Sequence, residues 1–153
     1  MNYNLKERLM WMQKLRVKGI ATNEDKDYIL MLENDKGLVL PIIINEFDAH
    51  AISLSCEGIT PETPLIYDVM KGVLGKVDCK LEKVVISNLV NGIFYTEIEF
   101  SHKDEKFSFA GRLSDAVILA INDNAPILIN SKLEEYFEDL QVSDKIVKSE
   151  YLN

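Results

Sequence analysis

The amino-acid sequence predicts an α+β domain, and three observations lead to that expectation. Several short stretches alternate apolar with polar residues, which is the pattern of half-buried strands. Turn-forming residues separate some of them, most clearly at Asn34–Gly37 and Asn91–Gly92, so antiparallel hairpins are expected there. Other segments have helical spacing and begin with capping residues. The predicted order is β-β-β-α-α-β-β-β-α-β-α, in which two three-stranded, mostly antiparallel β units pack with helices.

The first three strands are expected in residues 13–22, 27–33 and 38–44. Pro41 cannot donate a ladder hydrogen bond, so the third strand is expected at an edge or a bulge. Residues 1–12 are interpreted as an arm outside the domain. This arm is either a short amphipathic helix or a loose segment.

Two helices are expected next. Asn45 begins the first, Asp48 three residues later completes a capping box, and Gly58 ends the helix. Thr63, followed by a proline, is expected to cap the second helix, which ends at Gly75. The apolar residues of that second helix predict a core stripe: Leu65, Val69 and Val73.

The second half of the chain repeats the alternation of strands and helices. Strands are expected at 82–89, 93–100, 106–110 and 126–129, with a buried helix between the last two. Ser131 begins a Ser-x-x-Glu capping box and a short helix that reaches about residue 139. Residues 140–153 are a polar tail, so the domain is assigned to residues 13–139.

Composition and charge limit the function. The 153 residues are 47% hydrophobic and 27% charged, which suits one soluble domain. Seventeen basic and 25 acidic residues give a formal net charge of −8, which opposes tight non-specific binding of nucleic acid. No apolar run is long enough for a membrane span, and residues 1–11 lack the apolar pattern of a signal peptide, so none is expected. Cys56 and Cys79 form no disulfide framework, so a cytoplasmic protein is expected.

Polar residues gather where the buried helix is expected to begin. Arg112, Ser114 and Asp115 precede the apolar block of residues 116–121. A helix N-terminus has unpaired N–H groups and partial positive charge, so these residues suit anion binding or polar chemistry. The alternative interpretation is structural: Ser114 caps the helix, Asp115 complements its dipole, and Arg112 pairs with a carboxylate.

The same stretch resembles the bifunctional nuclease domain family. Residues 112–117 read Arg-Leu-Ser-Asp-Ala-Val and residues 125–127 read Ala-Pro-Ile, similar to the family's Asp-Ala-Arg-Pro-Ser-Asp-Ala-Ile and Ala-Pro-Ile. Residues 48–52, Asp-Ala-His-Ala-Ile, match an acidic residue followed by Ala-x-Ala-Ile. Residues 63–68, Thr-Pro-Leu-Ile-Tyr-Asp, match Arg-Pro-Leu-Thr-His-Asp. Thr63, Tyr67 and Ala110 stand where the family has Arg, His and Asp.

The resemblance implies a compact α+β domain that acts on RNA and DNA and forms a homo-oligomer. It implies catalytic roles for four residues: Asp68, Arg112, Ser114 and Asp115. Three carboxylates are the predicted ligands of Mg²⁺ or Mn²⁺: Asp48, Asp68 and Asp115. A second hypothesis also stands, because the three departures and the acidic charge favour a non-catalytic binding or assembly module that keeps the family fold.

Overall fold

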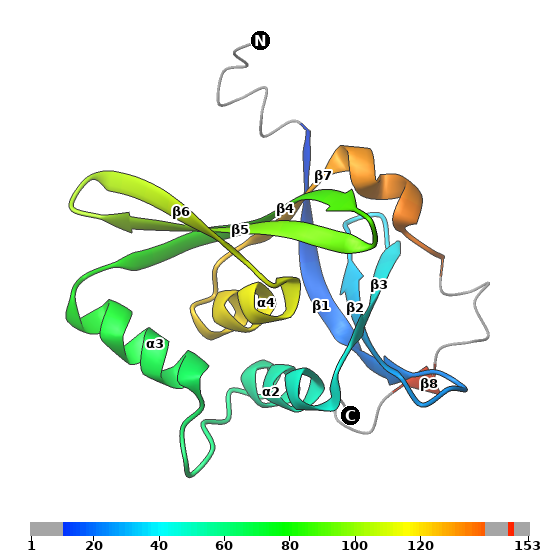
Figure 1. The fold of residues 1–153 in the computed structure, drawn as a ribbon, viewed down its shortest axis with the longest axis horizontal. Helices are drawn as coiled ribbons and strands as arrows, with labels where there is room; N and C mark the ends of the chain where they lie inside the picture. The colour runs from blue at the N-terminus through cyan, green and yellow to red at the C-terminus, as the bar shows by residue number, and fades with distance from the viewer. Residues whose placement is uncertain (1–10, 140–146, 149–153) are drawn as a thin grey trace.

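The structure is a computed structural model that describes residues 11–139 and 147–148 (Figure 1). Its strands form one mixed sheet in the order β3-β2-β1-β7-β4-β5-β6, and a short strand, β8 (Val147–Lys148), pairs with β1. The predicted α+β class and element order are confirmed. The predicted arm and tail lie almost wholly outside the described residues, so the domain boundaries stay a prediction.

The first predicted β unit is present as an antiparallel set of three strands. They are β1 (Met12–Thr22), β2 (Tyr28–Glu33) and β3 (Val39–Ile44). Gly37 has a φ of +79° in the predicted turn between β2 and β3, a conformation that favours glycine. Pro41 lies on β3, which ends the sheet order, so the predicted edge position is confirmed.

The second unit is also antiparallel and is built from longer strands. They are β4 (Lys80–Val90), β5 (Ile93–His102) and β6 (Glu105–Gly111). Asn91 and Gly92 have φ values of +53° and +78°, as a two-residue hairpin turn with two left-handed residues requires. Along β5 the residues that face the helices are more buried than their neighbours, which confirms the predicted alternation.

A short strand joins the two units into one sheet. β7 (Ile127–Asn130) pairs antiparallel with β1 and parallel with β4. The segment that follows is the 3₁₀ helix η1 (Ser131–Tyr136), capped by the side chain of Asn130, which accepts from the N–H of Lys132. The predicted Ser131 cap is therefore wrong by one residue.

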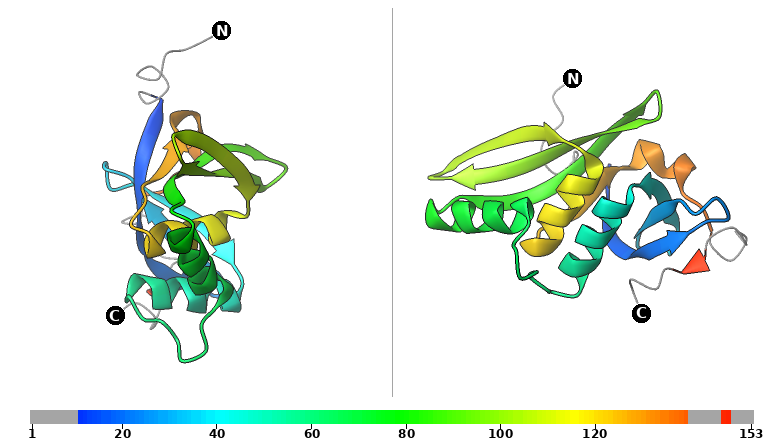
Figure 2. Two further views of the ribbon diagram at one scale, coloured as in Figure 1. Left: turned by 90° about the vertical axis from the view of Figure 1, so that its left-hand side faces the viewer. Right: turned by 60° about the horizontal axis from the view of Figure 1, so that its bottom comes forward.

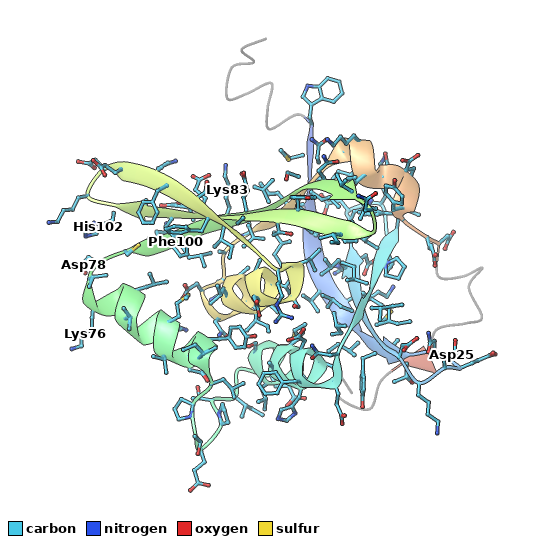
Figure 3. All side chains as sticks on the ribbon, in the orientation of Figure 1. Asp25, Lys76, Asp78, Lys83, Phe100 and His102 are labelled. Atoms are coloured by element: carbon cyan, nitrogen blue, oxygen red, sulfur yellow. The ribbon has the colours of Figure 1, made fainter. Side chains whose placement is uncertain are left out.

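Helices α2, α3 and α4 lie on one side of the sheet (Figures 1 and 2). α4 (Leu113–Asn122) packs on β4 and β5, and α2 (Glu46–Cys56) packs against α4. Asn45 caps α2 by accepting from the N–H of Asp48 at 2.7 Å, as predicted. Phe100 points to this side of the sheet, whereas Lys83 lies on the opposite, uncovered side (Figure 3). No described helix is long and apolar enough to cross a membrane.

The helix α3 (Ile66–Lys76) differs from its prediction in three respects. It begins at Ile66 rather than after Thr63, because the carboxylate of Asp68 accepts from the N–H of Leu65 and stabilises a later start. Its last residue is Lys76 and its C-cap is Val77, whereas Gly75 was predicted to cap it. Val69 and Val73, predicted to be core residues, are exposed, and Tyr67 is the buried residue of the helix.

Candidate functional site

The candidate site lies where β6 ends and α4 begins. Arg112 is the N-cap residue of α4, one position after the end of β6, and its carbonyl oxygen accepts from the N–H of Ala116 at 3.0 Å. The predicted Ser114 cap is therefore wrong, since the helix starts two residues earlier. β6 delivers the Arg112 side chain to a helix end that has unpaired N–H groups and partial positive charge.

Two carboxylates hold the Arg112 guanidinium. Nε and Nη2 donate to Asp115 at 2.8 and 2.7 Å, while Nη1 and Nη2 donate to Asp48 at 3.2 Å each. Both contacts are bidentate, which is the geometry that a guanidinium and a carboxylate favour. Because Asp48 belongs to α2, the guanidinium connects α2 with α4.

Tyr67 brings a third helix to the same group. Its hydroxyl donates to Oδ1 of Asp115 at 2.6 Å, and its ring is buried between α3 and the core. We call Asp48, Tyr67, Arg112 and Asp115 the Arg112 cluster. Each of the three α-helices supplies at least one of its members.

The structure brings some predicted site residues together and separates others. Asp48, Arg112 and Asp115 meet as described. Asp68 caps its own helix, with Oδ2 2.8 Å from the backbone nitrogen of Leu65. Ser114 is buried in the first turn of α4, and none of the hydrogen bonds that define the cluster involves it.

The sequence analysis missed Tyr67 as a member of the site. It treated this position as the loss of the family's histidine, whereas the tyrosine keeps a polar contact there. A signal was present, because Tyr67 directly precedes Asp68 inside a recognised motif. Periodicity alone could not show that its hydroxyl reaches a residue 48 positions away.

Burial and hydrogen bonding shift the pKa values of Tyr67, Arg112 and Asp115 from their ordinary values. Burial raises the pKa of Tyr67, and the hydrogen bond to Asp115 raises it further. The hydrogen bond from Arg112 lowers the pKa of Asp115, although burial opposes this effect. The hydrogen bond to Asp115 raises the pKa of Arg112, and the hydrogen bonds to Asp48 raise it further. These three groups therefore keep a neutral phenol, a carboxylate and a guanidinium at pH 7.

The donor set does not fit a divalent cation. Asp48 and Asp115 direct both carboxylate oxygens at Arg112, and Oδ1 of Asp115 also accepts from Tyr67. A metal ion would have to displace a guanidinium that is already neutralised by two carboxylates. Among the described residues, no group of three or more His, Cys, Asp or Glu side chains could hold a metal ion. The requirement for Mg²⁺ or Mn²⁺ stays a prediction.

A separate hollow lies on the uncovered side of the sheet. Its volume is about 880 Å³, and its lining mixes Trp11 and Phe107 with lysines such as Lys83 and with the acidic pair Glu97 and Glu99. None of the predicted site residues lines this hollow. The cluster and the hollow are therefore two distinct features of the molecule.

Together, fold and site define an α+β domain in which an arginine at a helix N-terminus is shared by two carboxylates. The family model of the bifunctional nuclease domain matches residues 29–138, which include the whole Arg112 cluster. The chain belongs to the bifunctional nuclease domain family.

Relatives in bacteria and plants agree with this assignment. An uncharacterized protein of Mycobacterium tuberculosis is 30% identical over 120 residues, covering 77% of this chain and 71% of its own. Bifunctional nuclease 2 of Arabidopsis thaliana is 28% identical over 119 residues, covering 76% of this chain and 36% of its own. Bifunctional nuclease 1 of Oryza sativa subsp. indica is 24% identical over 128 residues, covering 82% of this chain and 38% of its own. The chain thus spans little more than a third of these plant relatives.

Proposed function

We propose that this chain is a nuclease that hydrolyses phosphodiester bonds in RNA and DNA, with the Arg112 cluster as its active site. Family membership and the plant relatives named bifunctional nucleases support the reaction class. The observation that carries the proposal is the position of Arg112. A guanidinium that remains 58% exposed lies at a helix N-terminus and is fixed by two carboxylates, one of which also accepts from Tyr67.

Arg112 suits contact with a phosphate. Four of its five N–H hydrogens point at Asp48 and Asp115, which leaves one on Nη1 with no acceptor among the described residues. That hydrogen and the free N–H groups of the first turn of α4 favour an anion. Attack of water on phosphorus adds negative charge to the phosphoryl oxygens, and fixed donors stabilise this charge in the transition state.

Asp115 is the carboxylate suited to orient the attacking water. Its side chain is 31% exposed, whereas that of Asp48 is 4% exposed. Because Arg112 keeps Asp115 ionised, its oxygens can accept a hydrogen bond from water. As the water oxygen bonds to phosphorus it loses a proton to solvent, the P–O ester bond breaks, and the leaving alkoxide takes a proton from solvent. Asp68 and Ser114 remain predicted catalytic residues without a place in this scheme.

A non-catalytic binding or assembly module is the second candidate. It is favoured by the saturation of the cluster, in which both carboxylates are paired and Tyr67 is held in its neutral form. A cluster with one cation and two anions also repels a phosphate more than an isolated arginine would. On this interpretation the cluster only fastens three helices together.

Cleavage of fluorescently labelled single-stranded RNA and DNA separates the two candidates. We expect the wild-type protein to cleave both, and Arg112→Gln to lower kcat/KM by about 10²–10³-fold. Arg16→Gln is the matched control, because Arg16 also pairs with a carboxylate, Glu33 at 3.0 Å, but lies on β1. It should change kcat/KM by no more than about twofold, because the Arg16 side chain is 75% exposed and lies outside the Arg112 cluster.

Three outcomes would contradict the proposal. No cleavage by the folded wild type would leave the assembly module. Equal cleavage by Arg112→Gln and the wild type would point to another site or a contaminant. Equal losses in Arg112→Gln and Arg16→Gln would indicate a general loss of structure. Parallel reactions with Mg²⁺, Mn²⁺ and EDTA test the metal requirement separately, and Asp68→Asn and Ser114→Ala test the two unplaced residues.

A further inference from the structure

The hollow on the uncovered side of the sheet has the size of a site for a small organic ligand. Its volume of about 880 Å³ lies within the range of roughly 300–1,000 Å³ that such sites occupy. Two rows of paired residues cross the strands and line it. The first row runs over β7, β4 and β5, and the second over β4, β5 and β6: Leu128, Val85 and Glu97, then Lys83, Glu99 and Ser108. The sheet itself therefore forms the floor of the hollow.

The lining carries an excess of positive charge in a chain whose formal net charge is −8. Glu99 pairs with two lysines, Lys83 at 3.5 Å and Lys106 at 3.8 Å. Glu97 and Lys132 also line the hollow, and neither has an ion pair within the part of the chain that the structure describes. The lysines outnumber the glutamates by one, so the hollow attracts an anion although the chain as a whole repels it.

Trp11 adds a flat aromatic surface close to Lys132. It is the sole tryptophan of the sequence, and 60% of it is exposed. Its carbonyl oxygen accepts from the N–H of Ser131 at 2.6 Å, which holds its backbone beside the residue that precedes Lys132. Aromatic side chains stack on nucleobases of any kind, and sites for single-stranded nucleic acid combine them with lysines or arginines. The hollow has both components.

We infer that the hollow binds a nucleoside phosphate, with the base stacked on Trp11 and the phosphate held by Lys132. Lys132 donates to a phosphate without giving up an ion pair, whereas Lys83 and Lys106 already share a carboxylate. Glu97 opposes the anion, because no lysine of the lining is paired with it. A free nucleotide and a strand of RNA or DNA both present this chemical group.

The hollow is separate from the Arg112 cluster, so binding there does not depend on whether the cluster cleaves nucleic acid. No member of the cluster lines the hollow. The edge strand β6 nevertheless connects the two, since Ser108 lines the hollow and Arg112 directly follows the strand. At about 3.3 Å per residue, the backbone covers about 13 Å from Ser108 to Arg112. A strand bound in the hollow therefore has a short path over the edge of the sheet to Arg112.

Tryptophan fluorescence of the full chain tests the inference, because Trp11 is the sole tryptophan and lines the hollow. The probe is AMP, which has no phosphodiester bond, so its binding is independent of any nuclease activity. We expect saturable quenching by AMP. Adenosine and ribose phosphate each lack one of the two recognised groups and should bind at least about tenfold more weakly. Short single-stranded RNA, titrated into Arg112→Gln, then distinguishes the sources: tighter binding than AMP identifies a strand, and equal binding identifies a free nucleotide.

Two substitutions with opposite expected effects test the charges. Lys132→Gln should raise the Kd of AMP at least about tenfold, because a charged donor is lost. Glu97→Gln should lower it about three- to tenfold, because a repelling carboxylate is removed. Lys76→Gln is the matched control and should change the Kd less than about twofold. Lys76 is also exposed and has no ion pair among the described residues, but it lies on α3. Trp11→Ala, measured by calorimetry, should raise the Kd at least about fivefold.

Circular dichroism shows whether each variant has folded, and Glu97→Gln decides the matter if Lys132→Gln does not fold. Neither quenching nor heat at millimolar AMP overturns the inference. So does adenosine that binds as tightly as AMP, an equal effect of Lys132→Gln and Lys76→Gln, or weaker binding in Glu97→Gln. Weaker binding in Lys132→Gln together with tighter binding in Glu97→Gln supports it.

Discussion

Replacement of Arg112 by glutamine is expected to lower the free energy of unfolding by about 2–4 kcal/mol at pH 7. The Asp48 side chain is only 4% exposed, and Arg112 is its ion-pair partner among the described residues. Removal of one partner of a buried pair leaves a charge without compensation, which costs about 3–5 kcal/mol. We place the expected loss slightly lower, because 58% of the Arg112 side chain is exposed and water can partly replace it.

A double variant tests whether the unpaired carboxylate causes the loss. Asp48→Asn removes the buried negative charge that Arg112→Gln leaves without a cation. The double variant Asp48→Asn/Arg112→Gln should therefore recover most of the loss.

Urea unfolding followed by circular dichroism measures these differences. The expected loss corresponds to a fall in Tm of roughly 4–16 °C for a domain of this size. Arg16→Gln is again the control, since its partner Glu33 keeps a second cation, Lys18, at 3.7 Å. The reasoning fails if Arg112→Gln costs no more than Arg16→Gln, or if Asp48→Asn does not rescue it.

Five further outcomes are expected in the same unfolding assay. Tyr67→Phe should cost about 1–2 kcal/mol, because Asp115 loses a donor at 2.6 Å; equal stability of variant and wild type would argue against that bond. Burial raises the pKa of Tyr67, so wild-type stability should fall as the pH rises above about 10, and Tyr67→Phe should fall less. The lowered pKa of Asp115 stabilises the fold above pH of about 4, so wild-type stability should decline on acidification and Asp115→Asn should show a shallower decline. Gly92→Val should cost about 1–2 kcal/mol because Gly92 has a φ of +78°, whereas Gly72→Ala in α3, where a Cβ meets open space, should stabilise by about 0.5–1 kcal/mol.

Local pattern was sufficient to predict most strands of the fold. Alternation and turn residues located both antiparallel units, because each hairpin is formed by neighbours in the sequence. The union of the units into one sheet could not be predicted. It depends on β7, four residues that pair with β1 on one side and β4 on the other. Such pairing joins distant segments and leaves no periodic pattern in either of them.

Helix ends were harder to predict, because several residues compete to cap the same turn. Thr63 before a proline is a sound start signal, yet Asp68 accepts from the N–H of Leu65 and fixes a later start. Ser114 is a good capping residue, yet β6 runs directly into α4 and leaves the N-cap position to Arg112. In the first case a competing local hydrogen bond decides where the helix starts, and in the second the path of the preceding strand decides it.

The site was predicted in part, through the resemblance rather than through spacing. It indicated Asp48, Arg112 and Asp115, which meet in the structure, and also Asp68, whose carboxylate turns back to its own helix. Asp48 and Asp68 look equivalent in sequence, because each stands near the start of a helix. What distinguishes them is whether the side chain finds a guanidinium or an unpaired backbone N–H, and this is decided by the packing of α2, α3 and α4.

The error at α3 has a different physical origin. Helical spacing of apolar residues indicates that a helix is amphipathic, but it does not say which of its faces meets the core. Val69 and Val73 have the spacing of core residues and lie half exposed. The neighbouring face, which carries Tyr67 and Leu74, packs against the core instead. The choice between the two faces is made by the hydroxyl of Tyr67, which reaches Asp115 on another helix, and no pattern within α3 records that contact.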